Sequence, residues 1–417
     1  MATDDAQTRR PRLKILDVSP RIAIPARRGS AVRVFNLLCR LGRSHEVVGF
    51  SQARASRLLS VPTVREVQHS SSYVDLQFSH PLASLVGEIA ERSWVSAPIL
   101  SGAALGLTRP ARLNGLIRWA DVVLVEFPWQ FGYCRRQRPN APLVYASHNI
   151  EVDKFSSYAE AANARFRRPW LERIRRAEAD AVAHADVVLT VSAADSDRFV
   201  SQYGADPARV IEIPNGADTE RYQPVTREER AEAKRVLGLP DRPTVFFTGG
   251  NVPPNKVAAE WVRRLATQED RFTFLLLGEV GQPRVEGGLV EGGLVEGGLV
   301  ETGMVKDIGP YLRAADLSLV PVAHGGGTKI KLLESLAAGL PTVTFAEALH
   351  GTAFLDGEHV LVADKSVESL SSALHKLADD PLLADRLGTA ARHLMVKRYS
   401  WDSIAEQLDK VLVEVVR

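Results

Sequence analysis

The sequence contains little cysteine: Cys39 and Cys134 are the only two among 417 residues. Two thiols provide neither a disulfide framework nor a cysteine-based metal centre, so we expect no bound metal. The chain also lacks an apolar run of about 18 residues, the length that a membrane-spanning helix requires. Its first residues, MATDDAQTRRPR, contain no apolar segment of the kind that secretory signals carry. We therefore expect a cytoplasmic protein.

A strong excess of one charge is also missing, because the formal net charge is only +2. The charge is nevertheless uneven: residues 1–150 contain 20 Lys and Arg against 10 Asp and Glu, which leaves about −8 for the remainder. A basic half favours an anionic partner, such as a membrane surface, a lipid phosphate or an acidic polysaccharide. Nucleic acid is less well supported, because no recognisable binding module accompanies the charge. The alternative is a solvated basic face without a partner.

The composition is that of a globular protein, with 45% hydrophobic and 24% charged residues. A chain of this length can form two domains with separate cores. It opens with apolar and periodic segments that predict a strand at 13–18, a helix at 31–41 and a strand at 46–50. This order predicts parallel strands joined by right-handed crossovers. Residues 52–117 are harder to interpret; we expect several helices there, with 94–116 either a buried helical layer or an amphipathic surface patch.

The stretch VPVAHGGGTKIKLLESLAAGLPTVTF, residues 320–345, predicts a strand, a glycine loop, a helix and a second strand. Thr328 is suited to the helix N-cap, and Gly339 with Pro341 ends the helix. The free amides at such a helix start favour an anion, most often a phosphate. Lys331 and Glu334 lie three residues apart on one face, where the alternative is a simple solvated pair. The opposite face is expected to be buried through Ile330, Leu333, Leu336 and Ala337.

The segment GGGTKIKLLESLAAGLPTV resembles the donor-binding segment of the family 4 glycosyltransferases. The resemblance implies that Glu334 holds the ribose hydroxyls of a nucleotide-sugar, and that the diphosphate is held by Gly325, Gly326, Gly327, Thr328 and Lys331. Many members carry a second glutamate eight residues before the first, and this chain has Gly326 at that position. This chain therefore has no carboxylate at the position of the earlier glutamate.

Further segments of the family pattern occur along the chain. The segment HNIE follows a buried strand, and polar residues at the carboxyl end of a parallel strand are where α/β folds place binding groups. The resemblance makes His148 and Glu151 candidates for the reaction centre, whereas the alternative for His148 is a hydrogen-bonded structural residue. It also implies that the loop with Gly29 faces the active site and that Lys256 binds the donor phosphates. The position of the usual phosphate-binding arginine is occupied by Gly250 or Asn251.

The resemblance implies an α/β protein with the GT-B fold: two Rossmann-like domains that face each other across a cleft. An acceptor-side domain is expected at 1–219, joined by a final helix at 402–417 that packs back on it. A donor-binding domain is expected at 220–401. Within it, VEGGL is repeated three times and followed by a degraded copy, which predicts a mobile loop over 285–304, because so little apolar surface cannot offset the cost of ordering.

The implied reaction is transfer of a hexose from a UDP-, GDP- or ADP-sugar to an acceptor hydroxyl with retention, without a cofactor. A role in cell-envelope, exopolysaccharide or glycolipid synthesis follows, with a saccharide or lipid-linked acceptor. Peripheral contact with the anionic inner face of the plasma membrane would fit the basic first half. Two alternatives are a sugar-nucleotide epimerase of the same fold and a catalytically degenerate sugar-nucleotide-binding partner subunit.

Overall fold

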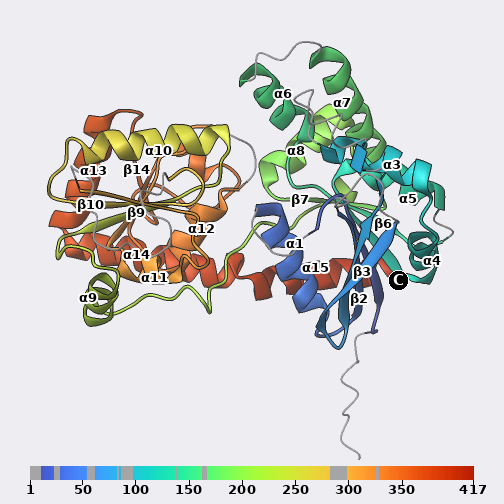
Figure 1. Ribbon diagram of the computed structural model, residues 1–417, viewed down its shortest axis with the longest axis horizontal. Helices are drawn as coiled ribbons and strands as arrows, with labels where there is room; N and C mark the ends of the chain where they lie inside the picture. Colours follow the sequence, from blue (N-terminus) through green and yellow to red (C-terminus); the bar gives the residue numbers. More distant parts are fainter. Residues whose placement is uncertain are drawn as a thin grey trace, which may run out of the picture. The chain divides into compact units, whose positions relative to one another are not determined.

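The computed structural model describes residues 11–22, 29–53, 62–81, 84–85, 97–137, 140–161, 167–281, 298–324 and 328–417. The chain divides into two compact units (Figure 1). The first comprises Met1–Ile213 with Ile404–Arg417, and the second comprises Pro214–Ser403. The domain boundaries predicted from the sequence are 219/220 and 401/402, whereas those of the structure are 213/214 and 403/404.

The first unit contains, among its described residues, an eight-stranded sheet with strand order β3-β4-β2-β1-β5-β6-β7-β8. All neighbouring strands are parallel except β3 and β4, which pair antiparallel. The strands are β1 (Lys14–Ser19), β2 (Glu46–Ala53), β3 (Thr63–Ser70), β4 (Tyr73–Ser79), β5 (Val122–Glu126), β6 (Leu143–Ala146), β7 (Val187–Thr190) and β8 (Val210–Glu212). The helices are α1 (Gly29–Leu41), α3 (Ser101–Thr108), α4 (Ala111–Trp119), α5 (Phe131–Gln137), α6 (Glu151–Ala161), α7 (Arg167–His184) and α8 (Ala193–Tyr203).

The sequence predicts several helices within 52–117 and no strand, but the structure also contains the hairpin β3–β4 at residues 63–79. β3 is an edge strand whose residues are mostly exposed, so TVREVQHS carries little of the apolar alternation that identifies a strand. Helices do follow, in α3 and α4. Their inner residues Leu105, Leu113 and Ile117 join the core, which favours the buried helical layer over a purely superficial patch.

The second unit contains, among its described residues, a six-stranded parallel sheet with strand order β11-β10-β9-β12-β13-β14. The strands are β9 (Thr244–Thr248), β10 (Thr273–Leu277), β11 (Leu299–Gly303), β12 (Leu317–Val320), β13 (Thr342–Thr344) and β14 (Leu361–Val362). The helices are α9 (Arg227–Val236), α10 (Pro253–Ala266), α11 (Gly309–Ala314), α12 (Ile330–Ala337), α13 (Val367–Asp379) and α14 (Pro381–Leu394).

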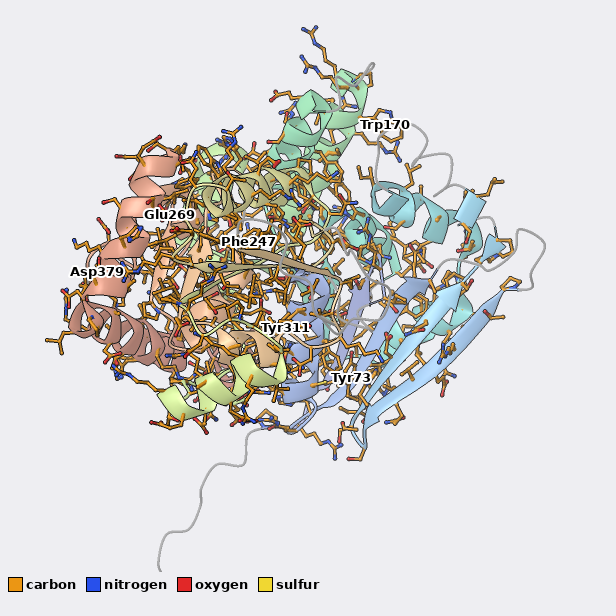
Figure 2. All side chains as sticks on the ribbon, turned by 60° about the vertical axis from the view of Figure 1, so that its left-hand side comes forward. Tyr73, Trp170, Phe247, Glu269, Tyr311 and Asp379 are labelled. Carbon is orange, nitrogen blue, oxygen red and sulfur yellow. The ribbon has the colours of Figure 1, made fainter. Side chains whose placement is uncertain are left out.

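The two faces of this sheet bury alternate strand residues, as the two-residue period of a strand requires. Val245 and Phe247 of β9 pack with helices α10 and α13, whereas Phe246 packs with α9 and α11 on the opposite face. Figure 1 shows α10 and α13 on one side of the sheet and α9 and α11 on the other. Phe247, labelled in Figure 2, lies almost fully buried in this interior. Burial on both faces explains why the strands read as continuous apolar runs.

The predicted mobile loop over 285–304 is wrong at its end, because the degraded fourth copy of the pentad forms β11. Leu299 and Val300 are buried there, and β11 pairs with β10 at the sheet edge. Residues 282–297 lie outside the described residues. Thr302 replaces the first glycine of the pentad in this copy. A strand is therefore formed at a smaller loss of conformational entropy, because glycine loses more than any other residue.

The last helix, α15 (Trp401–Val416), begins in the second unit and continues into the first. Its residues Ile404, Leu408 and Leu412 are buried, at the spacing of one helix face. No helix within the described ranges is both long and apolar enough to cross a membrane.

Candidate functional site

The donor-side candidates lie on α12, which follows β12 in the second unit. The helix starts at Ile330, with Lys329 as N-cap and no side-chain capping bond, so the predicted N-cap role of Thr328 is wrong. Thr328 is buried two residues before the helix. The predicted end is confirmed: Gly339 has a φ of 68°, and a Cβ there would approach Pro224 to 2.9 Å. Gly325, Gly326 and Gly327 lie outside the described residues.

Lys331 does not form the solvated pair with Glu334 that was the alternative interpretation of the sequence. Its Nζ donates to Oδ1 of Asn255 in the first turn of α10, and it lies 5.6 Å from the ring centroid of Phe247. Asn255 in turn donates from Nδ2 to the carbonyl of Gly250 at 2.9 Å. Because β9 and β12 are neighbours in the parallel sheet, the loops after them meet at its carboxyl edge. The structure therefore joins Lys331 to the loop that the sequence assigned to the donor phosphates.

Lys256, the predicted phosphate-binding residue of that loop, is exposed on α10. The structure brings Asn255, its buried neighbour, to Lys331 instead. Sequence analysis did not select Asn255. The one signal for it was its position next to Lys256, the lysine expected to bind the donor phosphates.

Burial shifts the ionisation of both polar residues on α12. It lowers the pKa of Lys331 to about 8; Lys329 acts in the same direction and Glu334 opposes it. It raises the pKa of Glu334 to about 7, against the opposing charges of Lys331 and Arg221. Two groups that titrate near neutrality on one helix face are typical of functional sites rather than of a surface ion pair.

Arg392 of α14 fixes the segment that runs past α12. It donates to the carbonyls of Thr219 and Tyr222, both at 2.7 Å, and to the carbonyl of Ala337 at the end of α12. The Tyr222 ring is partly buried, and the charge of Glu334 helps to raise its pKa, after burial. Sequence reasoning missed Arg392, because 170 residues separate it from Tyr222.

His148 lies in the first unit, just beyond the carboxyl end of β6. Its Nε2 bonds Oε2 of Glu126, the last residue of β5, and both side chains are buried. The ring of Phe127 stacks on the imidazole, with centroids 4.3 Å apart and planes at 16°. Glu126 was not predicted; the signal was a carboxylate that ends the otherwise apolar run VVLVE.

Glu151 makes different contacts. Its carboxylate is almost fully buried and accepts from Nζ of Lys154 at 3.1 Å, while its amide donates to Oε1 of Glu178 at 2.7 Å. Glu178 thereby caps α6, and burial raises its pKa to about 7. Gly29 is the exposed first residue of α1, and the loop before it, 23–28, lies outside the described residues. The structure thus brings His148 to Glu126 rather than to Glu151.

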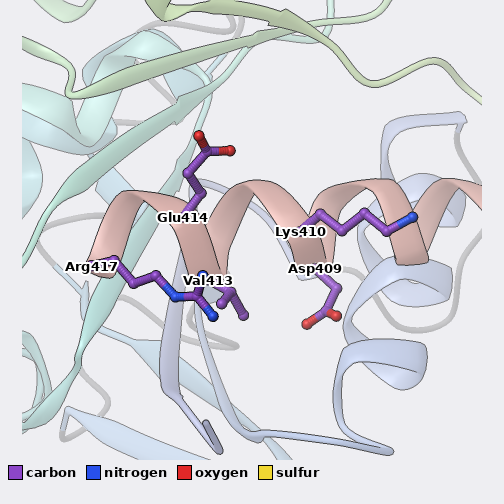
Figure 3. A pocket seen from close by; sticks show the side chains of 5 residues that line it. All are labelled: Asp409, Lys410, Val413, Glu414 and Arg417. Carbon is purple, nitrogen blue, oxygen red and sulfur yellow. The ribbon is translucent and has the colours of Figure 1, made fainter. Parts of the chain in front are cut away.

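Metal ligands and a surface hollow were also sought outside these two groups of residues. In the part of the chain that the structure describes, no group of three His, Cys, Asp or Glu side chains is placed to hold a metal ion. A hollow on α15 contains none of the predicted site residues and is lined by two acids, two bases and one valine (Figure 3): Asp409, Lys410, Val413, Glu414 and Arg417.

Comparison with solved structures identifies the fold. Sucrose-phosphate synthase from Thermosynechococcus elongatus has a TM-score of 0.72 at 19% identity, over 96% of this chain and 99% of that chain. Anabaena HepE in complex with UDP-glucose has a TM-score of 0.65 at 16% identity, over 96% of this chain and all of that chain, 100%. The predicted α/β architecture of the GT-B type is confirmed.

Comparison of sequences identifies the family. The model for Glycosyltransferase Family 4 matches residues 27–221, and the model for Glycosyl transferases group 1 matches residues 242–380. A D-inositol 3-phosphate glycosyltransferase of Actinosynnema mirum is 30% identical over 299 residues, 67% of this chain and 68% of the relative. Another, from Rhodococcus opacus strain B4, is 30% identical over 67% of this chain, and the match spans only 63% of that relative's length. The chain belongs to the family 4 glycosyltransferases.

Proposed function

We propose that this protein transfers a hexose from a nucleoside diphosphate sugar to an acceptor hydroxyl, with retention of anomeric configuration. The observation that carries the proposal is the pair Lys331 and Glu334 on one face of α12, with Lys331 bound to the loop after β9. A cation suits a diphosphate, and a carboxylate suits the two hydroxyls of a ribose. The UDP-glucose complex of HepE, a protein of the same fold, supports a donor of this class.

In this proposal Lys331 stabilises the negative charge that develops on the leaving diphosphate, which is an electrostatic contribution to the transition state. Glu334 fixes the nucleoside and so orients the sugar. His148, held by Glu126 in the first unit, contacts the transferred sugar or the acceptor. The roles of Gly29, Lys256, Thr328, the triplet 325–327 and Glu151 remain the predictions made from the family pattern.

A thermal-shift screen against UDP-, GDP- and ADP-sugars tests the donor class. The matching donor should raise the melting temperature, because a ligand that binds only the folded state at 100 times its Kd stabilises it by about 2.7 kcal/mol. Transfer is then tested by release of the nucleoside diphosphate, which should require an acceptor. If none of the three donor classes raises the melting temperature, the proposal is wrong.

A binding subunit without turnover is a second candidate, favoured by one observation. The first glutamate of the family pattern is replaced by Gly326, and the usual arginine by Gly250 or Asn251. Donor binding without nucleoside diphosphate release, across saccharide and lipid-linked acceptors, would support this alternative.

We further propose a saccharide or lipid-linked acceptor of the cell envelope, reached at an anionic membrane surface. The observation is that Leu107, Arg109, Arg112 and Arg118, along α3 and α4 and the turn between them, are exposed, with Arg112 also paired to Glu66. Attraction of each basic residue to anionic lipid contributes about 1 kcal/mol and is screened by salt. Binding to phosphatidylserine vesicles should therefore weaken as salt rises and be lower in Arg109→Ser/Arg118→Ser. Absence of binding at low salt would instead indicate a soluble acceptor.

A further inference from the structure

Two buried carboxyl groups lie on the neighbouring strands β1 and β5 of the first unit's sheet. Asp17 of β1 is 2% exposed and Glu126 of β5 is 4% exposed. Oδ1 of Asp17 is buried and has no hydrogen-bond partner among the described residues. Burial, followed by the charge of Glu126, raises the pKa of Asp17 well above its usual range. This shift favours the protonated form of Asp17, whose hydroxyl can donate a hydrogen bond.

The charge of Glu126 also acts on Arg33 of α1, which is itself buried. Burial lowers the pKa of Arg33 to about 10, and the charge of Glu126 opposes that shift, so Arg33 is a cation at neutral pH. One of its Nη atoms also donates to the carbonyl of Ile213 at 2.7 Å. A buried cation and anion that support each other are costly to separate, because either one alone would be uncompensated.

A carboxylate can only accept hydrogen bonds, and Oε2 of Glu126 is bonded to Nε2 of His148. His148 must therefore carry its proton on Nε2, which leaves Nδ1 as the variable nitrogen. Among the described residues, Nδ1 makes no hydrogen bond. The edge of the ring that faces away from Glu126 is thus the edge available to a ligand.

The backbone at Phe127 favours the same interpretation. This residue has φ 69° and ψ 160°, a conformation that a side chain larger than glycine rarely adopts. Such strain persists only where the surrounding structure imposes it, and it concentrates at functional sites. Here its result is that the Phe127 ring lies flat on His148. The imidazole is held on one edge by Glu126 and on one face by Phe127.

We propose that Glu126 is a positioning residue for the transfer reaction: together with the stacked ring of Phe127 it fixes His148 in the tautomer with the proton on Nε2, so that Nδ1 meets a hydroxyl of the bound sugar. This inference rests on the proposed transferase function for its kinetic consequence only. The tautomer itself is a property of the protein without substrate.

The tautomer is measured first, in the wild-type protein, by long-range ¹H–¹⁵N correlation of the histidine side chains. The His148 signals are assigned by their absence from the spectrum of His148→Gln. The expected result is a neutral ring protonated on Nε2. A ring protonated on Nδ1 would overturn the proposal, whether or not any variant folds and whether or not the protein is a transferase.

Glu126→Gln then tests the consequence, because the amide keeps the shape but removes the charge and adds a competing donor. The variant should give mixed His148 tautomers and lower kcat about 10- to 100-fold, the effect expected when a group that orients a histidine is lost. The Kd for UDP, or for whichever nucleoside diphosphate binds, should stay within twofold. Glu172→Gln, an exposed glutamate paired with Arg175 and Arg176, is the matched control. Unchanged kcat and unchanged tautomer in a folded Glu126→Gln variant would show that Glu126 has only a structural role.

Asp17→Asn provides a second variant should Glu126→Gln fail to fold. An asparagine has the size of aspartic acid and, like its protonated form, is neutral and can donate a hydrogen bond, so the His148 tautomer should remain as in the wild type. Asp17→Leu removes the donor and should change the tautomer signal. If Asp17→Asn alters the tautomer in the folded protein, Asp17 is not the proton holder and the network is wrong.

Discussion

Replacing Glu334 with alanine should weaken binding of the donor nucleotide at least about tenfold. A carboxylate that accepts two ribose hydroxyls makes charge-assisted bonds worth roughly 1.5–3 kcal/mol each, and 1.4 kcal/mol corresponds to one decade of affinity. The measurement is a calorimetric titration of the matching nucleoside diphosphate into wild type and variant. An exposed ion pair would contribute no more than about 1 kcal/mol and would have no specific effect on the donor.

Glu347→Ala is the matched control for this experiment. Glu347 lies in the same unit, in the short helix η4 (Ala346–Leu349), and pairs with Lys365 at the surface. Its removal should leave nucleotide affinity within twofold. Equal affinities for wild type and Glu334→Ala would mean that the assignment of α12 as the donor site is wrong.

The loss in Glu334→Ala should also depend on pH. Only the ionised carboxylate accepts both hydroxyl bonds, and the pKa of Glu334 is raised to about 7, so affinity should rise as pH increases through 7. Lys331, whose pKa is lowered to about 8, loses its charge above that pH, and affinity should then fall. The optimum is expected between these values. Glu334→Gln should lose the rise on the acid side, while any titration of the ligand itself is common to both proteins.

Replacing His148 with alanine should lower kcat by about 10- to 100-fold while leaving nucleoside diphosphate affinity nearly unchanged. The imidazole contacts the sugar rather than the nucleotide in the proposed function, and one hydrogen bond to a charged or strongly polarised group is worth about 1.5–3 kcal/mol. Steady-state kinetics with the full donor, combined with titration of the nucleoside diphosphate alone, separates the two effects.

His184→Ala is a suitable comparison, because His184 is exposed at the end of α7 and pairs with Asp180. It should not change kcat. A His148→Ala variant that folds, binds the nucleotide and turns over at the wild-type rate would leave His148 as a hydrogen-bonded structural residue.

The segments that the sequence predicted correctly share one property: their pattern is local. Helix α12 follows from apolar residues at helical spacing and from the glycine at its end, and β1 and β2 follow from the largely apolar segments at 13–18 and 46–50. Burial of both sheet faces produces such runs without knowledge of the neighbours. The hairpin β3–β4 was not predicted, because its exposed edge strand lacks this pattern. Strand β11 was not predicted, because its two buried residues belong to a glycine-rich repeat that indicated a loop.

The amino-acid sequence by itself determined the parallel α/β class, the candidate residues Lys331, Glu334 and His148, and their places at the ends of strands. Only the tertiary structure decided which side chains they meet: Lys331 meets Asn255 across 76 residues, and His148 meets Glu126 across 22. The physical reason is that strand order in a sheet is not encoded in local spacing. It places the ends of β9 and β12, and of β5 and β6, side by side, so a polar partner is selected by sheet topology rather than by its neighbours in the chain.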